Sequence, residues 1–193
     1  MTPGPVLDAA LAAQAACEKL GLSFCVIGGV ALQRWGEPRF TADADMSVMV
    51  EPGMELVAAE ALLAELPARI DDALAFAART RVVLARSAGN IGIDIVLAGL
   101  PFEARVISRA SPWSLGDGKL LHTCSAEDLL VMKVFAARDK DWADVTSILE
   151  RQGEKLDFDL VRRELGPLLD AKGEPDLANE LERRIERHVL PRE

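Results

Sequence analysis

The chain has 193 residues, of which 50% are hydrophobic, and its formal net charge is −9 at pH 7. This length suits one domain with a core of its own, or one domain with a small addition. The acidic balance argues against a protein that binds nucleic acid over its whole surface, because such binding depends on neutralising phosphates with lysine and arginine. A local basic patch around an acidic pocket stays compatible with this charge.

The sequence predicts a cytoplasmic protein that does not enter a membrane. No apolar run is long enough to span a bilayer, and the first residues lack the basic segment of a signal peptide. Cys17, Cys25 and Cys124 are odd in number and lack CxxC spacing, so we expect buried thiols in a reducing compartment.

The first two thirds of the chain alternate helical and strand patterns, and the last third is helical throughout. In chain order we expect a helix over 6–20, a strand over 22–27, a short helix over 30–35, a strand over 41–50, a helix over 54–66, a short helix over 69–78, strands over 80–87 and 91–98, a helix over 101–109, loop and strand over 112–123, and helices over 129–137, 139–152, 157–169 and 175–188. This order predicts an α/β (α+β) fold, a mixed sheet flanked by helices and followed by a helical bundle. The expected domains are residues 1–123 and 124–193.

The stretch 27–50 carries the most informative motif. Strand side chains alternate between faces, so Asp43 and Asp45 share a face at about 6–7 Å, where they can share divalent cations. Gly28 and Gly29 allow a ligand to approach the backbone closely, and they open a helix whose N-terminal amides suit phosphate. A phosphate-binding turn followed by an aspartate pair is typical of an enzyme that holds a metal-bound nucleoside triphosphate. The alternative is a pair of solvated or capping carboxylates at a strand start.

Asp94 is a single carboxylate inside an otherwise apolar strand, Gly92-Ile93-Asp94-Ile95-Val96-Leu97. An isolated buried charge costs several kcal/mol, so this aspartate is expected to be paired, protonated or bound to a metal. The alternative is an aspartate that faces outward on an edge strand.

Two patterns together resemble a known family. The first is Gly28-Gly29, a short helix, and the run Arg39-Phe40-Thr41-Ala42-Asp43-Ala44-Asp45. The second is Lys133 on one helix, followed by Arg138-Asp139-Lys140-Asp141-Trp142-Ala143-Asp144 at the start of the next. They are similar to the polymerase-beta-type nucleotidyltransferase superfamily and, within it, to the AbiEii-type toxin group. Many superfamily members have serine where Gly29 stands, and glycine agrees with the AbiEii-type group.

The resemblance implies a nucleotidyltransferase-type mixed sheet and a role for each matching residue. Asp94 matches the third carboxylate of the superfamily, beside the aspartate pair, and Asp45 is expected to bridge two Mg²⁺ ions. The expected site consists of Asp43, Asp45 and Asp94 as catalytic and metal-binding residues, Lys133 as a catalytic and nucleotide-binding residue, and Gly28, Gly29, Arg39, Thr41, Arg138, Lys140 and Asp141 as further nucleotide-binding residues.

Simpler uses stay open for the residues outside the aspartates. Lys133 has apolar neighbours and suits either a phosphate pocket or a helix edge from which its ammonium reaches solvent. Asp141 and Asp144 share a helix face, where they could position Lys133 or Arg138 or ligate the attacking group. The alternative is that they only interact with the helix dipole, which favours acidic residues in a first turn. Arg39 and Thr41 contact substrate or brace their loop.

The resemblance implies a Mg²⁺-dependent enzyme that moves a nucleoside monophosphate from an NTP to a hydroxyl of RNA, such as tRNA, or of a protein. It also implies a cognate antitoxin. An acidic protein needs a local basic patch to meet RNA, for which the candidates are Arg34, Arg39, Arg79, Arg81 and Lys140. The alternatives are a small-molecule transferase of the kind that adenylylates aminoglycosides, whose cationic substrate suits an acidic protein, and a non-catalytic module that binds nucleotide or a partner.

Overall fold

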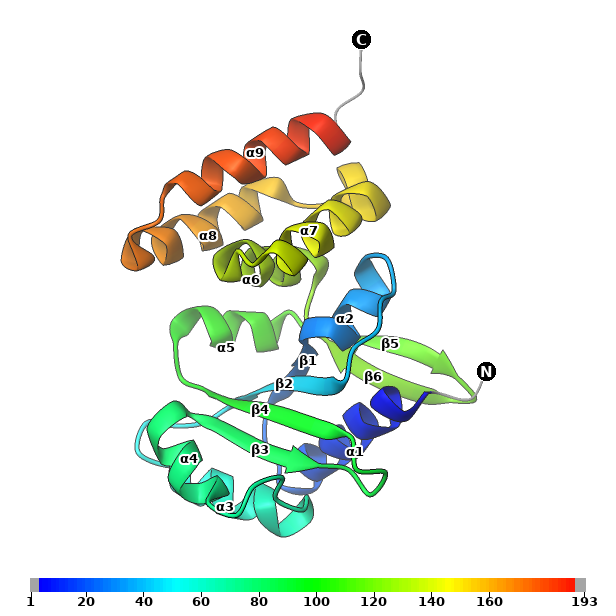
Figure 1. The fold of residues 1–193 in the computed structure, drawn as a ribbon, viewed down its shortest axis with the longest axis vertical. Coiled ribbons are helices and arrows are strands. Elements are labelled where there is room, and N and C mark those ends of the chain that lie inside the picture. Colours follow the sequence, from blue (N-terminus) through cyan, green and yellow to red (C-terminus); the bar gives the residue numbers. More distant parts are fainter. Residues whose placement is uncertain (1–3, 190–193) are drawn as a thin grey trace. The chain divides into compact units, whose positions relative to one another are not determined.

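The computed structural model describes residues 4–189, which form two compact units (Figure 1). Of the described residues, 4–31 and 40–124 form the sheet unit, and 32–39 and 125–189 form the helical unit. In chain order the elements are α1 (Pro5–Lys19), β1 (Phe24–Ile27), α2 (Gly28–Trp35), β2 (Asp43–Met49), α3 (Glu55–Glu65), α4 (Ala73–Thr80), β3 (Val82–Arg86), β4 (Gly92–Ala98), α5 (Pro101–Ser108), β5 (Ser111–Gly116), β6 (Lys119–Thr123), α6 (Ala126–Ala136), α7 (Asp139–Gln152), a short 3₁₀ turn (Gly153–Lys155), α8 (Phe158–Lys172) and α9 (Asp176–His188).

Within residues 4–189, the sheet unit contains a six-stranded mixed sheet in the order β3-β4-β2-β1-β6-β5. β2 pairs with β4 in parallel and with β1 in antiparallel orientation. β2 and β4 are therefore adjacent strands, and neither lies at an edge of the sheet. β3 pairs antiparallel with β4, and β6 pairs in parallel with β1. This arrangement confirms the mixed sheet that the alternating helices and strands predicted.

One face of the sheet carries the apolar core of the sheet unit. Alternate residues of β2, such as Ala44, Met46 and Val48, are buried on this face, where α1 packs on β2 and α3 packs on β3. The alanine-rich face of α1 allows this helix to pack closely on β2, β1 and β4. The intervening residues of β2 and β4 point to the opposite face, and these include the aspartates of the motif.

The helical unit contains α6 to α9 and the last turn of α2. α6 contacts α7, α8 and α9, and their apolar residues, among them Leu129, Ile148 and Leu165, are completely or almost completely buried. α6 begins at Ala126, three residues before its expected start, and Ser125 Oγ caps it by accepting a hydrogen bond from the backbone N–H of Asp128 at 3.1 Å. α7 begins and ends at the predicted residues, Asp139 and Gln152.

Several expected elements differ from the structure in their bounds. The helix expected over 69–78 begins at Ala73, because residues 67–69 bond to β3 as an extra edge segment. The short helix expected over 30–35 begins at Gly28, directly after β1. The stretch 112–123 forms a complete hairpin, β5 and β6, whose turn at Gly116, Asp117 and Gly118 has positive φ throughout.

The three cysteines are buried and free of disulfides within the described residues, as expected. Burial raises the pKa of the Cys17 thiol to about 12, so this thiol stays protonated at neutral pH. None of the helices that the structure describes is long and apolar enough to cross a membrane.

Candidate active site

Three aspartates lie side by side on the face of the sheet opposite the core; we call Asp43, Asp45 and Asp94 the aspartate cluster. β2 and β4 are parallel, and their register places Asp45 directly beside Asp94, and Asp43 beside Gly92. Residues opposite each other on adjacent strands point to the same face, so the two strands bring the predicted third carboxylate next to the predicted pair. The side chains of Asp43 and Asp94 are 46% and 33% exposed, which leaves them accessible to a ligand.

The glycine turn before α2 lies against the aspartate cluster. Ile27, the last residue of β1, pairs with Asp45, so the chain enters the turn beside this carboxylate. Gly28 has φ +63°, and a Cβ at this position would overlap the Asp45 carboxylate. A Cβ on Gly29 would lie 2.6 Å from Thr41 Oγ1. Both glycines are therefore required by close approach, and the first also by its backbone conformation.

Arg69 contacts the aspartate cluster, although no sequence pattern indicated this contact. Its Nη2 lies 2.6 Å from Asp94 Oδ1, and its Nη1 lies 3.4 Å from Asp43 Oδ1. The Nη2–H group is not directed at Asp94 Oδ1, and this buried oxygen has no hydrogen-bond partner among the described residues. The local pattern placed Arg69 at the start of a short helix, and only the register of the sheet reveals its position.

Burial raises the pKa of the Asp94 carboxyl, and the nearby charge of Asp43 raises it further, whereas the Arg69 guanidinium acts in the opposite direction. Burial thus disfavours the ionised form of Asp94 in the metal-free protein. A cation bound beside this carboxylate would favour its ionised form.

The aspartate cluster has the chemistry of a Mg²⁺ site. Mg²⁺ prefers oxygen ligands and is commonly held by one or two carboxylates together with waters and substrate phosphates. Within residues 4–189, no group of three or more His, Cys, Asp or Glu side chains converges closely enough to hold a metal ion by itself. Adjacent carboxylates and the buried Asp94 Oδ1 without a hydrogen bond nevertheless fit an ion that takes its other ligands from a nucleotide.

The other predicted site residues lie in the helical unit, where five of the charged side chains form what we call the ion cluster: Lys133, Asp141, Asp144, Arg39 and Arg138. Lys133 Nζ lies 3.0 Å from Asp141 Oδ1 and 2.7 Å from Asp144 Oδ2. Arg39 contacts both oxygens of Asp144, at 2.7 and 2.8 Å, and Arg138 contacts both oxygens of Asp141. The two aspartates therefore hold Lys133 in a fixed position on α6.

The ion cluster has a buried centre and an exposed rim. The side chains of Asp141, Asp144 and Lys133 are 0%, 2% and 8% exposed, whereas those of Arg39 and Arg138 are 37% and 61% exposed. Burial opposes ionisation of both aspartates, but the hydrogen bonds from the lysine and the arginines outweigh it and hold their pKa values below the usual range. Within these five residues three cations contact two anions, and the arginines are the members that reach solvent.

Two basic residues proposed for an RNA-binding patch lie elsewhere. Arg81 precedes β3 at the end away from Asp43, and its Nη1 lies 2.5 Å from Glu55 Oε1. Arg79, in the last turn of α4, lies nearest Asp72, at 3.8 Å. Neither joins the aspartate cluster. Lys140, on the first turn of α7, is exposed.

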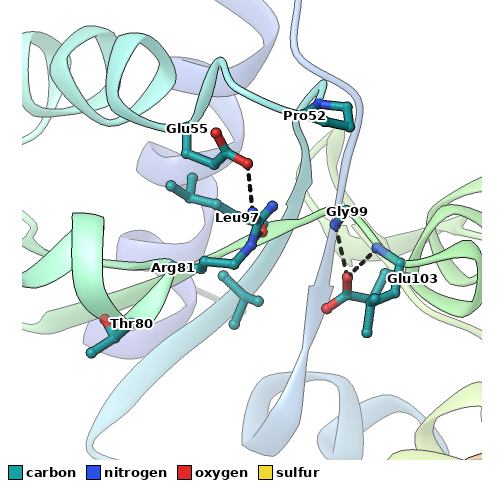
Figure 2. A pocket seen from close by; sticks show the side chains of 9 residues that line it. Pro52, Glu55, Thr80, Arg81, Leu97, Gly99 and Glu103 are labelled. Carbon is teal, nitrogen blue, oxygen red and sulfur yellow. Dashed lines mark hydrogen bonds and ion pairs between the residues drawn. The ribbon is translucent and has the colours of Figure 1, made fainter.

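Arg81 lines a pocket of about 360 Å³ at the carboxyl end of β4 (Figure 2). Its charged groups are bonded to one another or to the backbone: Arg81 Nε donates to the Leu97 carbonyl at 3.0 Å, and Glu103 accepts from the N–H groups of Gly99 and Leu100 at 2.8 and 2.9 Å. These bonds fix the starts of α3 and α5 against the sheet. The pocket therefore has a structural explanation, and the aspartate cluster is the better candidate site.

Comparisons with known proteins agree with this geometry. The model of a family described as "Nucleotidyl transferase AbiEii toxin, Type IV TA system" matches residues 9–192. Among solved structures, an antigenic nucleotidyltransferase-like protein from Paracoccidioides brasiliensis is similar, with 18% identity, a TM-score of 0.54 and 91% of each chain covered. The antibiotic-resistance factor ANT(2'')-Ia is similar with 18% identity and a TM-score of 0.51, over 89% of this chain and 93% of that one. No curated protein matches the chain.

The structural likeness shows the fold, and the family match spans nearly the whole sequence. The GG turn, the DxD strand and the lysine-aspartate pattern of α6 and α7 are the residues on which the resemblance depended. The chain belongs to the AbiEii nucleotidyltransferase toxin family and is a nucleotidyl-transfer enzyme.

Proposed function

We propose that this protein transfers a nucleoside monophosphate from a Mg²⁺-bound NTP to an acceptor hydroxyl. The observation that carries the proposal is the register of β2 and β4, which sets Asp94 beside Asp45 on an accessible face. The turn at Gly28 adds a helix N-terminus next to the same carboxylate. Carboxylates for cations and backbone amides for phosphate are the two elements that phosphoryl transfer requires of a protein.

The aspartate cluster and the two glycines of the turn each have a role in this proposal. When bound, two Mg²⁺ ions would neutralise the triphosphate and stabilise the charge of the attacking and leaving oxygens. Asp45 is the residue proposed to contact both ions, and Asp43 to contact the one on the nucleotide side. Asp94 would help hold the other ion and would take or orient the proton of the acceptor hydroxyl, and pyrophosphate would leave as the new bond to the α-phosphorus forms. Gly28 and Gly29 admit phosphate to the start of α2.

The ion cluster is proposed to bind nucleotide phosphate from the helical unit. The ammonium of Lys133 is already shared between two aspartates, so its charge is largely neutralised within the cluster. Arg39 and Arg138 are the cations of the cluster that reach its exposed rim. We therefore assign phosphate contact chiefly to these arginines and Lys140, with Lys133 as a catalytic candidate and Asp141 and Asp144 as the residues that hold it.

The acceptor is proposed to be RNA, such as tRNA, or a protein, with this chain as the toxin of a toxin–antitoxin pair. The family description supports this choice. A small-molecule acceptor of the aminoglycoside type is the second candidate. It is favoured by the net charge of −9, which attracts a polycationic substrate, and the likeness to ANT(2'')-Ia makes it worth testing.

Label transfer tests the proposal. The protein is incubated with each α-labelled NTP and Mg²⁺, together with total RNA, cell lysate or a panel of aminoglycosides, and Asp45→Asn serves as the inactive control. Label in RNA or protein that disappears in the control identifies the acceptor class, and label in an aminoglycoside supports the second candidate. Nucleotide binding without transfer to any acceptor would leave a non-catalytic module. Absence of Mg-NTP binding would overturn the proposal.

A further inference from the structure

Arg69 is held at the aspartate cluster by its backbone. Its N–H donates to the carbonyl of Leu84 at 2.9 Å, and the adjacent Ala68 forms a β-bridge with Ala85. Leu84 is paired with Asp94 across β3 and β4, so the backbone of Arg69 lies in line with the strand position of Asp94. These backbone bonds fix the start of a long side chain, which then extends over the sheet toward Asp94 and Asp43.

Gly92 leaves room for this side chain. A Cβ at position 92 would overlap both the Asp43 carboxylate and the Arg69 guanidinium. Glycine inside a strand weakens it by about 0.5–1 kcal/mol, and it commonly marks a place where another group approaches closely. Here the approaching groups are the arginine and the aspartate, so the glycine belongs to the arrangement that brings them together.

The guanidinium also contacts carboxylates that a metal ion would need. The Arg69 guanidinium contacts two of the three aspartates: its Nη2 lies 2.6 Å from Asp94 Oδ1 and its Nη1 lies 3.4 Å from Asp43 Oδ1, and its side chain remains 31% exposed. A divalent cation on Asp94 and Asp43 would compete with the guanidinium for the same oxygens. An exposed arginine can move aside without leaving a charge buried in the protein.

We infer that Arg69 is an internal counter-cation of the aspartate cluster: it neutralises Asp43 and Asp94 in the metal-free protein and withdraws when a divalent cation binds. This inference rests on the proposed function only in that the cluster binds such a cation. The Arg69 guanidinium would make the metal-free protein more stable, and its affinity for a divalent cation lower, than in a protein without this arginine. Arg69 is thus a positioning residue that sets metal affinity.

The test measures Mn²⁺ binding by calorimetry, without nucleotide, and the melting temperature in EDTA. Arg69→Gln should bind Mn²⁺ about tenfold more tightly than the wild type, which corresponds to about 1.4 kcal/mol. Its melting temperature in EDTA should be lower than that of the wild type, and added Mn²⁺ should raise its melting temperature by more. Arg69→Lys, which keeps a charge but cannot bridge two carboxylates, should lie between the two proteins and serves if the glutamine variant does not fold.

Arg86→Gln is the matched control, since Arg86 lies on β3, the strand with which the segment of Arg69 pairs, and its side chain bonds Asn90 at 3.2 Å. It should leave Mn²⁺ affinity unchanged. Equal or weaker Mn²⁺ binding by Arg69→Gln would overturn the inference while leaving the proposed function intact. A failure of wild type and variant alike to bind Mn²⁺, with or without nucleotide, would overturn both.

Discussion

The aspartate cluster of the sheet unit and the ion cluster of the helical unit are both built from aspartates and basic residues, yet they differ in charge balance and burial. The first has three aspartates contacted by one arginine, and the side chains of Arg69, Asp43 and Asp94 are about one third to one half exposed. The second has two aspartates beneath three basic residues, and its centre is almost completely buried. An excess of negative charge that solvent can reach suits an external cation, whereas a buried lysine paired with two aspartates cannot be removed without a large cost in stability.

The strongest test of this difference is Asp45→Asn. Removing a carboxylate that contacts both metal ions loses several kcal/mol of transition-state stabilisation, so transfer should fall by about 10³-fold or more. Unfolding by urea should change little, because the substitution relieves repulsion among three aspartates. Asp8→Asn, an exposed aspartate of the same unit, is the control and should retain full activity. Full activity of Asp45→Asn would show that the cluster is not the catalytic centre.

Lys133→Met tests the opposite property in the ion cluster. It leaves Asp141 and Asp144 buried with one partner fewer each, and breaking a buried pair in this way costs about 3–5 kcal/mol. We expect a large fall in the urea midpoint. Lys140→Met, on the exposed start of α7, should leave it unchanged. Adding Asp144→Asn to Lys133→Met should restore part of the lost stability. If Lys133→Met alone is as stable as the wild type, Lys133 does not stabilise the fold.

The contrast between the clusters also marks what the sequence could predict. Asp43 and Asp45 lie two residues apart, and Asp141 and Asp144 lie three apart, so strand and helix geometry alone places each pair on one face. The match of Asp94 to a third carboxylate came from the family resemblance. The register of β2 and β4 then agreed with it.

Contacts between distant segments could not be predicted. Arg69 reaches Asp94 because residues 67–69 pair with β3, and no periodic pattern announces such an edge segment. The bidentate contact between Arg39 and Asp144 joins residues 105 apart in the chain. The hairpin at 111–123 was missed in part because Pro112 interrupts the strand pattern, although proline is tolerated on an edge strand such as β5.

Gly28→Ala sharpens the description of the sheet unit. Alanine at φ +63° costs about 1–2 kcal/mol, and its Cβ would in addition displace Asp45. Gly21→Ala provides a close control, since Gly21 has φ +66° and open space around its Cα. We expect both variants to lose stability by differential scanning calorimetry, and Gly28→Ala alone to lose transfer activity. Equal activity in the two would mean that Asp45 tolerates displacement.

Acid should weaken the ion cluster. The pKa values of Asp141 and Asp144 are lowered in the folded protein, so both contribute stability above the ordinary aspartate value of 3.8, and this contribution is lost as the pH falls through their folded values. Urea midpoints measured from about pH 6 to about pH 3 should therefore decline at the acidic end. The double variant Asp141→Asn, Asp144→Asn should decline less steeply. An identical slope would show that other carboxylates dominate acid unfolding.

Arg162 and Glu182 supply the exposed counterpart of the ion cluster within the same unit. Arg162 contacts both carboxylate oxygens of Glu182, at 2.8 and 2.9 Å, with the geometry that Arg39 has toward Asp144. Their side chains are 49% and 40% exposed, however, and a pair in solvent contributes only about 0.2–1 kcal/mol. Arg162→Ala should lower the free energy of unfolding by no more than this, and the loss should shrink in about 1 M salt, where the screening length is about 3 Å. Arg163→Ala, the next residue on α8, controls for the change in helix propensity. A loss from Arg162→Ala as large as that from Lys133→Met would mean that burial is not what separates the ion cluster from an ordinary surface pair.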